Sequence, residues 1–465
     1  MKRRDFLSAA GAAAASCLAP HWLRSQSAAA PISATLTIDE SSTLAAIPPD
    51  FIGLSYESAQ LANPAFFSAE NTSLIALFLE LGHEGILRLG GGTSEFTAFT
   101  TKEPPPTAPF DAVGPDTSKN VKSDTPITPK SLRHLRAFLD ATGWRCLYGL
   151  NLGRGPLDRA AEEASYVDKI LGPRLIAFQL GNEPDAWRNR YRPATWSYTD
   201  YWKEWTAAHA AIVARVPQAK FAGPDVSNKM AYVTGFAADA KRSAPDVVML
   251  TSHYYAMGPA GKPGMTIDRL LSPNPKLAGD LKIAVAAAHS AGLPYVMSEG
   301  NSCWNGGQPG VSDTFAGALW AADVLLQFAA GGCSGACLHG GGSGFYTPIA
   351  GSLAAGFVRR PEFYGMKIFR PFVGATIVRA TLDCANDRLR AYAARRSGSA
   401  LTIVINKTDQ PATIRTSLHG AHKQWQLTAP AIDAKQGVTL TAGATTALHK
   451  NLLHVPAFTA VLLEK

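Results

Sequence analysis

The sequence predicts a (β/α)8 barrel followed by an antiparallel β-sandwich. Between residues 49 and 362, eight short apolar runs alternate with segments of helical periodicity, and a polar residue stands at or near the end of each run. After residue 363 the pattern changes to short runs of alternating apolar and polar residues. The first pattern favours a barrel and the second a sandwich. An open, doubly wound sheet is the alternative, but no GxGxxG or GxxxxGKS/T motif follows any run.

The predicted barrel strands are nearly continuous apolar runs. Such runs are typical of parallel strands that are covered on both faces. We place the eight strands at Phe51–Glu57, Ile86–Gly90, Arg145–Asn151, Leu175–Gly181, Lys220–Pro224, Val247–His253, Tyr295–Glu299 and Gly335–His339.

The predicted helices carry start and stop signals. Thr128 can cap a helix that has Pro129 at its first position, and Pro156 and Gly172 bracket another. The helices are predicted at Ser68–Leu81, Pro129–Thr142, Leu157–Leu171, Thr199–Val216, Lys229–Arg242, Asp280–Ala291 and Ser312–Ala330.

The C-terminal sandwich is predicted over residues 363–465. An early run, Ala34–Ile38, also alternates and precedes the barrel, so we expect residues 31–48 to add a strand to the sandwich. The barrel then occupies residues 49–362. The C-terminal strands are predicted at Ala375–Arg379, Leu389–Ala393, Leu401–Asn406, Thr413–Ser417, Gln424–Leu427, Val438–Thr441 and Ala460–Glu464.

The first 30 residues have the features of an export signal. Residues 2–7, Lys-Arg-Arg-Asp-Phe-Leu, resemble the twin-arginine signal, and an Ala-rich stretch and small residues at 27–30 follow. The stretch is too short to remain as a membrane helix. The segment therefore predicts a periplasmic or secreted protein with no stable membrane insertion after the signal is cleaved.

Charge and cysteine content exclude several functional classes. The formal charge is +8, of which the first 30 residues contribute +3, and no long Lys/Arg run follows them. Nucleic acid is therefore not a predicted partner. The five later cysteines are too few and too scattered for a disulfide framework, and no histidine pair accompanies them as in a zinc site. The sequence predicts neither a metal nor a cofactor.

Two glutamates define the predicted chemistry. Glu183 ends the fourth predicted strand and Glu299 the seventh, at the face where (β/α)8 barrels carry their active sites. Two carboxyl groups about 5–5.5 Å apart can share the work of retaining glycoside hydrolysis, one as acid/base and one as nucleophile. A shared site also pushes their pKa values apart. The other strand-end residues are Glu57, Arg88, Asn151, Asn182, Asp225, His253, Tyr254, Tyr255 and His339.

The chain resembles the retaining (β/α)8 glycosidases, which have an Asn-Glu pair after the fourth strand and a Glu after the seventh. Within that group it most resembles glycoside hydrolase family 79, which contains β-glucuronidases and heparanase-like enzymes. The resemblance covers residues 32–465. It rests on the segments at 87–91 (LRLGG), 148–151 (YGLN), 181–185 (GNEPD), 252–255 (SHYY), 298–301 (SEGN) and 338–342 (LHGGG).

The resemblance implies a role for each matching residue. Glu183 would be the acid/base and Glu299 the nucleophile, Asn182 would bind the sugar 2-hydroxyl, and Tyr255 would donate to Glu299. In that family, the loop after the eighth strand helps to bind the glucuronate carboxylate through backbone N–H groups and a tyrosine hydroxyl. Gly342 and Tyr346 would supply these groups, and Trp304 would stack on the sugar or wall the pocket. The remaining predicted binding residues are Asn151, His253 and Arg88.

The leading interpretation is a retaining exo-β-glucuronidase that acts on glucuronide-containing oligo- or polysaccharides. Another retaining glycosidase of the same group, such as a β-xylosidase or arabinofuranosidase, would need no carboxylate pocket. A heparanase-like endo-glucuronidase would bind long sulfated chains, for which basic clusters are missing from the sequence. A non-catalytic carbohydrate-binding protein would not need both glutamates and Asn182. A serine hydrolase is not favoured, because no GxSxG motif occurs.

Overall fold

The computed structural model describes residues 31–102, 124–341, 344–443 and 445–465. The predicted export signal at residues 1–30 and the predicted binding residue Gly342 lie outside this part of the chain. Within it, no helix has the length and apolar character that crossing a membrane requires.

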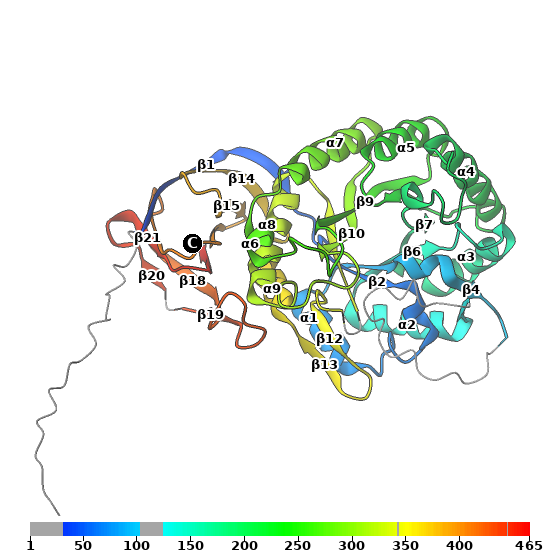
Figure 1. Ribbon diagram of the computed structural model, residues 1–465, viewed down its shortest axis with the longest axis horizontal. Coiled ribbons are helices and arrows are strands. Elements are labelled where there is room, and N and C mark those ends of the chain that lie inside the picture. The colour runs from blue at the N-terminus through cyan, green and yellow to red at the C-terminus, as the bar shows by residue number, and fades with distance from the viewer. Residues whose placement is uncertain (1–30, 103–123, 342–343, 444) are drawn as a thin grey trace, which may run out of the picture.

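Eight parallel strands close into the predicted barrel, which forms one side of the molecule (Figure 1). Around the barrel the order is β10-β11-β2-β3-β6-β7-β8-β9, so strands that follow one another in the chain are neighbours in space. The strands are β2 (Ile52–Glu57), β3 (Ile86–Gly90), β6 (Arg145–Leu150), β7 (Leu175–Leu180), β8 (Phe221–Val226), β9 (Val247–Met257), β10 (Tyr295–Cys303) and β11 (Gly335–Gly340). All eight overlap the predicted runs.

The inside of the barrel changes from apolar to polar along the strands. The side chains that fill its N-terminal end form a compact apolar cluster of Ile86, Leu147, Ala177, Ala222, Met249, Val296 and Cys337. Because strand side chains alternate between faces, the residues two positions later also point inward. These residues are polar on five strands: Arg88, Gln179, Thr251, Ser298 and His339. The barrel interior therefore has an apolar layer at its N-terminal end and, above it, a layer of polar side chains. We call this polar layer the floor of the site.

Helices surround the barrel (Figure 1). The helices α2 and α3 begin at the predicted residues, whereas α1, α7 and α8 begin three to five residues away from their predicted starts. Thr128 accepts from the backbone N–H of Ser131, as expected for the α2 cap. The predicted start of α4 is wrong by one residue, because Ser197 and Asp200 form a capping box ahead of Tyr198. The helices are α1 (Thr72–Leu81), α2 (Pro129–Thr142), α3 (Leu157–Leu171), α4 (Tyr198–Arg215), α5 (Met230–Ser243), α6 (Ile267–Leu271), α7 (Pro275–Ala291), α8 (Phe315–Ala330) and α9 (Pro361–Phe369).

Several short elements were not predicted, some in the connections between barrel strands and some between the barrel and the C-terminal sheet. They are too short to show a clear period: α6, α9, the pair β4 (Thr97–Phe99) and β5 (Thr125–Ile127), and the hairpin β12 (Ile349–Ser352) and β13 (Gly356–Arg359).

The C-terminal strands form one curled sheet, with the order β19-β18-β22-β16-β15-β14-β1-β17-β21 and β20 beside β18. β1 (Ile32–Ala46) pairs with β14 in antiparallel and with β17 in parallel orientation. Side chains of β17 and β21 pack against those of β16 and β22 inside the curl. The other strands are β14 (Thr376–Asp383), β15 (Leu389–Arg396), β16 (Ser399–Asn406), β17 (Ala412–Thr416), β18 (Ala421–Thr428), β19 (Thr439–Ala442), β20 (Thr446–Ala447), β21 (Leu452–Val455) and β22 (Thr459–Glu464).

The sheet and the barrel share a buried interface, made mainly through α8 and α9. One continuous apolar cluster includes residues of both parts. Asp323 of α8 is buried within this interface, where it pairs with Lys407 at 2.6 Å and accepts from the Tyr392 hydroxyl at 2.6 Å. Since a buried charge is costly unless it is paired, these contacts hold the sheet in one position against the barrel.

Candidate active site

A cavity of about 950 Å³ opens at the carboxyl ends of the barrel strands. This is the face where (β/α)8 barrels carry their active sites. Seven of the predicted site residues line the cavity: Glu183, Glu299, Asn182, His253, Tyr255, Trp304 and Tyr346, the last from the loop after β11.

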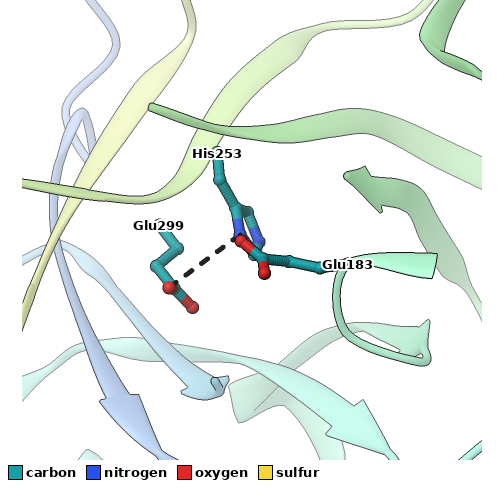
Figure 2. Close-up of side chains that lie close together, drawn as sticks. All are labelled: Glu183, His253 and Glu299. Atoms are coloured by element: carbon teal, nitrogen blue, oxygen red, sulfur yellow. Dashed lines mark hydrogen bonds and ion pairs between the residues drawn. The ribbon is translucent and has the colours of Figure 1, made fainter. Parts of the chain in front are cut away.

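Glu183 and Glu299 meet inside this cavity, as Figure 2 shows. One carboxyl oxygen of each lies within 4.8 Å of the other and of a ring nitrogen of His253. Glu299 lies in β10 at a register shift that interrupts the alternation of the strand, so that both Ser298 and Glu299 reach the site. Glu183 follows β7 in a left-handed conformation with φ 50°. Gly181, with φ 83°, begins the turn that carries Glu183 over the end of the barrel.

Arg88 of β3 lies beneath both glutamates and is fully buried. It donates to Glu299 Oε2 at 2.5 Å, to Asp225 Oδ2 at 2.5 Å and to Asn182 Oδ1 at 2.8 Å. A side chain at Gly90 would overlap the guanidinium group, which explains the glycine there. Arg88 also donates hydrogen bonds to the side chains of Gln179 and Ser55. Arg88 therefore holds Glu299 in place, one of the two roles that the sequence left open for it. Arg88 does not line the cavity, so the structure gives it no direct contact with a substrate there.

Asp225 and His253 form the second half of the polar floor. His253 Nδ1 lies 3.1 Å from Glu183 Oε1, in hydrogen-bond geometry. Its Nε2 lies 3.1 Å from Asp225 Oδ1, at ion-pair distance but not in hydrogen-bond geometry. Burial alone would lower the pKa of His253, but the charges of Asp225 and Glu299 outweigh burial and raise it to about 10. His253 is therefore an imidazolium at neutral pH.

The pKa values of the two glutamates are displaced in opposite directions. Burial raises the pKa of Glu183, and this effect outweighs the hydrogen bond and charge of His253. Burial also opposes ionisation of Glu299, but the charges of His339, His253 and Arg88 outweigh it and lower the pKa of Glu299. Burial thus favours the protonated form of Glu183, and the surrounding positive charges favour the ionised form of Glu299. An acid and a nucleophile require pKa values displaced in these directions.

Tyr255 and Tyr346 form one wall above Glu299. The Tyr255 hydroxyl donates to Glu299 Oε1 at 2.8 Å, and the two tyrosine rings lie 6.4 Å apart. Beside them, the indole of Trp304 is 43% exposed and lines the cavity mouth. An exposed indole at this place can stack on a sugar ring.

Asn151 does not belong to this group, so its prediction as a binding residue is wrong. Its Nδ2 donates to the carbonyl of Thr97, and its Oδ1 accepts from the backbone N–H groups of Arg154 and Gly155. Asn151 therefore holds the loop after β6, and it does not line the cavity.

Glu183, His253 and Glu299 are also close enough together to hold a cation. A histidine that binds a metal must be neutral, with a free lone pair on one ring nitrogen. Both nitrogens of an imidazolium carry protons. The raised pKa of His253 therefore opposes metal binding here. The donor set fits an acid/base pair better than a metal centre.

The acidic and basic residues of the site that were not assigned a role from the sequence include Glu57, Glu95, Asp225 and His339. Glu57, Asp225 and His339 stand at the ends of barrel strands, and this position is the sequence feature that could have indicated a place in the site. His339 Nδ1 is 2.9 Å from Ser55 Oγ, and its Nε2 is 3.6 Å from Glu57 Oε1. Glu95 lies in a loop and carries no such signal.

Comparison with known proteins agrees with this geometry. No protein-family model matches the chain. The chain is 26% identical to the β-glucuronidase of Aspergillus niger over 376 residues, which are 74% of this chain and 66% of that protein. It is 26% identical to the β-glucuronidase of Neurospora crassa over 319 residues, 61% of this chain and 55% of that protein. The chain thus spans less than two thirds of these curated relatives.

Solved structures share the whole architecture. A 4-O-α-L-rhamnosyl-β-D-glucuronidase from Fusarium oxysporum has a TM-score of 0.71 at 16% identity and covers 93% of this chain and 100% of its own. A family 51 arabinofuranosidase from Xanthomonas axonopodis has a TM-score of 0.67 at 13% identity, with 93% and 99% coverage. At these identities the structures show the shared fold alone. Together with the curated relatives, the comparisons support a glycoside hydrolase.

The hydrogen bond from Tyr255 predicts a shift in the pH profile of any glycosidase activity. A nucleophilic carboxyl must be ionised to attack, so with Glu299 in the nucleophile role that the resemblance implies, activity would be lost as the pH falls through its lowered pKa. Tyr255→Phe removes a donor that stabilises the ionised form, which raises that pKa. We expect the acid limb of kcat/KM to move to higher pH and kcat to fall about tenfold.

The measurement is a pH–rate profile of the wild type and Tyr255→Phe. Tyr254→Phe is a suitable control, since the Tyr254 hydroxyl bonds Asn274 and not Glu299. An acid limb that stays in place in Tyr255→Phe would show that this hydroxyl does not tune Glu299.

Proposed function

We propose that this protein is a retaining exo-β-glucuronidase of glycoside hydrolase family 79. The observation that carries the proposal is the Glu183–Glu299 pair, whose oxygens approach within 4.8 Å and whose pKa values are displaced in opposite directions. Retaining enzymes have carboxyl groups about 5–5.5 Å apart, whereas inverting enzymes separate them by about 6.5–9.5 Å to admit a water.

In the first step, the Glu299 carboxylate attacks the anomeric carbon. The bond from that carbon to the aglycone oxygen breaks, and Glu183 gives its proton to that oxygen. The product is a covalent glycosyl ester of Glu299. Asn182 supports this step, because Arg88 occupies its Oδ1 and the amide nitrogen is left to donate to the sugar 2-hydroxyl.

In the second step, the ionised Glu183 takes a proton from water. The water oxygen attacks the anomeric carbon and the ester bond breaks, which regenerates the Glu299 carboxylate and protonated Glu183. His253 donates to Glu183 Oε1 at 3.1 Å and stabilises its charged form between the two steps. Arg88 and Tyr255 stabilise the Glu299 carboxylate before the first step and after the second, when the ester bond is absent.

The wall around Tyr346 supports a glucuronide as the substrate. Burial and the charges of Glu299 and Glu57 raise the pKa of Tyr346, while hydrogen bonds from the Tyr255 hydroxyl and the backbone N–H of Gly306 lower it. Hydroxyl and amide donors at one place suit a carboxylate. The two curated relatives are named β-glucuronidases, in agreement with this assignment.

A comparison of aryl glycosides tests the proposal. We expect kcat/KM for a 4-nitrophenyl β-glucuronide to exceed that for the β-xyloside or α-arabinofuranoside by at least about 100-fold, since donors aimed at a missing carboxylate are left unpaired. Tyr346→Phe should lower glucuronide turnover about 10–100-fold, the effect of one hydrogen bond to a charged group.

The same assay separates the alternatives. Tyr346→Phe should leave any xyloside turnover within about threefold of the wild type, because that substrate has no carboxylate. Preference for the arabinofuranoside would instead favour the activity named for the family 51 neighbour. Binding of glucuronides without turnover would favour a carbohydrate-binding protein. Export through a twin-arginine signal to the periplasm or medium stays a prediction from the sequence.

A further inference from the structure

Glu95 is a buried carboxyl that the steps above do not use. It lies in the short helix η2 (Gly92–Phe96) after β3 and is 1% exposed. Its Oε1 accepts from the backbone N–H of Asn182 at 2.7 Å, and its Oε2 accepts from the backbone N–H of Gly153 at 2.6 Å. One carboxyl group therefore joins the loops that follow three neighbouring strands, β3, β6 and β7.

The carboxyl is held mainly by these two amides. Burial raises the pKa of Glu95 to about 7, while the N–H groups of Asn182 and Gly153 lower it; Arg192 and Arg190 act on it through charge. A buried carboxylate is costly unless hydrogen bonds replace its water. Bonds to an ionised acceptor are about twice as strong as neutral ones, so this arrangement fixes its two partners firmly.

The peptide that Glu95 fixes is the one that presents the proposed acid/base. Gly181 and Glu183 both have left-handed φ angles, so the chain leaves the extended conformation of β7 here. One backbone bond to β6, from Gly181 N–H to the Leu150 carbonyl, is kept. A left-handed non-glycine residue is strained and persists only where its surroundings determine it. The other bonds of the turn are Glu183 N–H to the Asp225 carbonyl, Trp187 Nε1 to the Asn182 carbonyl and Arg88 to Asn182 Oδ1.

The second amide explains a glycine in the loop after β6. A Cβ at Gly153 would lie 2.8 Å from Glu95 Oε2, too close for an ordinary contact. The Gly153 backbone therefore approaches closely enough to anchor Glu95 Oε2, while Glu95 Oε1 holds Asn182. The carboxyl cannot turn away from Asn182 without losing both bonds.

We propose that Glu95 is a positioning residue that fixes the Asn182 peptide and thereby aims Glu183 at the leaving-group oxygen. Glu95 does not line the cavity, so it acts through Asn182 and not on the substrate. The inference rests on the proposed function and adds a residue to it.

The test compares two leaving groups in Glu95→Gln. Glutamine keeps the shape but turns an NH2 group toward one of the two amides, which weakens the anchor. The 2,4-dinitrophenolate leaving group departs without being protonated. The phenol leaving group departs only when a general acid protonates its oxygen. Since displacement of a catalytic group by 1 Å can cost about 100-fold, we expect kcat/KM for the phenyl substrate to fall at least about tenfold further than for the dinitrophenyl substrate.

Glu163→Gln is a matched control. Glu163 of α3 is also buried, burial raises its pKa to about 7 as well, and its Oε1 accepts from the Tyr148 hydroxyl at 2.7 Å. It has no contact with the turn that carries Glu183. We expect Glu163→Gln to keep the ratio of the two substrates within about twofold of the wild type, whatever it does to thermal stability.

Equal losses on both substrates in Glu95→Gln, or a ratio change of the same size in Glu163→Gln, would overturn the proposal. If Glu95→Gln does not fold, Glu95→Asp replaces it, because a shorter carboxylate keeps the charge but reaches only one amide. A wild-type ratio in Glu95→Asp would likewise overturn it. Absence of glucuronide turnover in the wild type would instead contradict the proposed function.

Discussion

Glu299→Gln is expected to lower turnover of an aryl β-glucuronide by at least about 10⁴-fold, the order of loss when an enzyme loses its nucleophile. The amide has the same shape and can still meet Arg88 and Tyr255, but it cannot form the glycosyl ester. Because the first step then fails for every substrate, activated and poor leaving groups should lose activity alike. Initial rates with dinitrophenyl and phenyl glucuronides measure this.

Covalent labelling identifies the nucleophile independently. A 2-fluoro-glucuronide with an activated leaving group should inactivate the wild type and leave its glycosyl group on the peptide that carries Glu299. Glu299→Gln should not be labelled, and Glu163→Gln should be labelled like the wild type. A label on any other residue would contradict the assignment, and thermal unfolding would show whether the variants are folded.

Glu183→Gln is expected to separate the two steps of the reaction. General acid catalysis contributes about 10²–10⁴-fold, so the phenyl glucuronide should lose that much in kcat/KM, while the dinitrophenyl glucuronide should lose little. With the dinitrophenyl substrate the glycosyl ester should form at nearly the normal rate and then persist, because no base activates water. A burst of dinitrophenol followed by slow turnover is the expected trace.

Glu183→Ala extends this test through chemical rescue. Azide can enter the space left by the side chain and attack the glycosyl ester without a general base, so it should restore dinitrophenyl turnover and yield a β-glucuronyl azide. Glu299→Gln should show no such rescue. Unchanged phenyl glucuronide activity in Glu183→Ala would remove Glu183 from the mechanism.

The pH profile follows from the same pair. Activity requires Glu183 protonated and Glu299 ionised. It should therefore fall on the acid side as Glu299 is protonated, at a lowered pKa, and on the alkaline side as Glu183 loses its proton, at a raised pKa. The acid and alkaline limbs of the pH–rate profile are therefore moved apart, and the enzyme is active over a wider range of pH.

The barrel and the two glutamates were predictable because their signals are local. A parallel strand covered on both faces must be apolar along its length, so all eight strands could be located from their own residues. Helix ends such as Thr128 and Pro129 depend on hydrogen bonds within one turn. Glu183 and Glu299 could be singled out because a carboxyl at the end of a barrel strand lies at the active face.

The direction of each side chain was not predictable in this way. Asn151 and Arg88 also stand near strand ends, yet one turns into a loop and the other lies beneath the cavity. The form of the C-terminal sheet was similarly hidden, since its curl depends on how β17 and β21 pack against β16 and β22. Short strands such as β20 and β21 carry too few residues to show a period.

The sequence by itself thus determined the strand count, the domain pattern and the pair of carboxyls. Only the tertiary structure decided how these carboxyls differ. Arg88 and Glu299 are 211 positions apart in the chain, and Glu95 and Asn182 are 87 apart. Strand and helix signals act between residues a few positions apart, whereas a pKa or the aim of a side chain depends on charges and donors that only folding brings together.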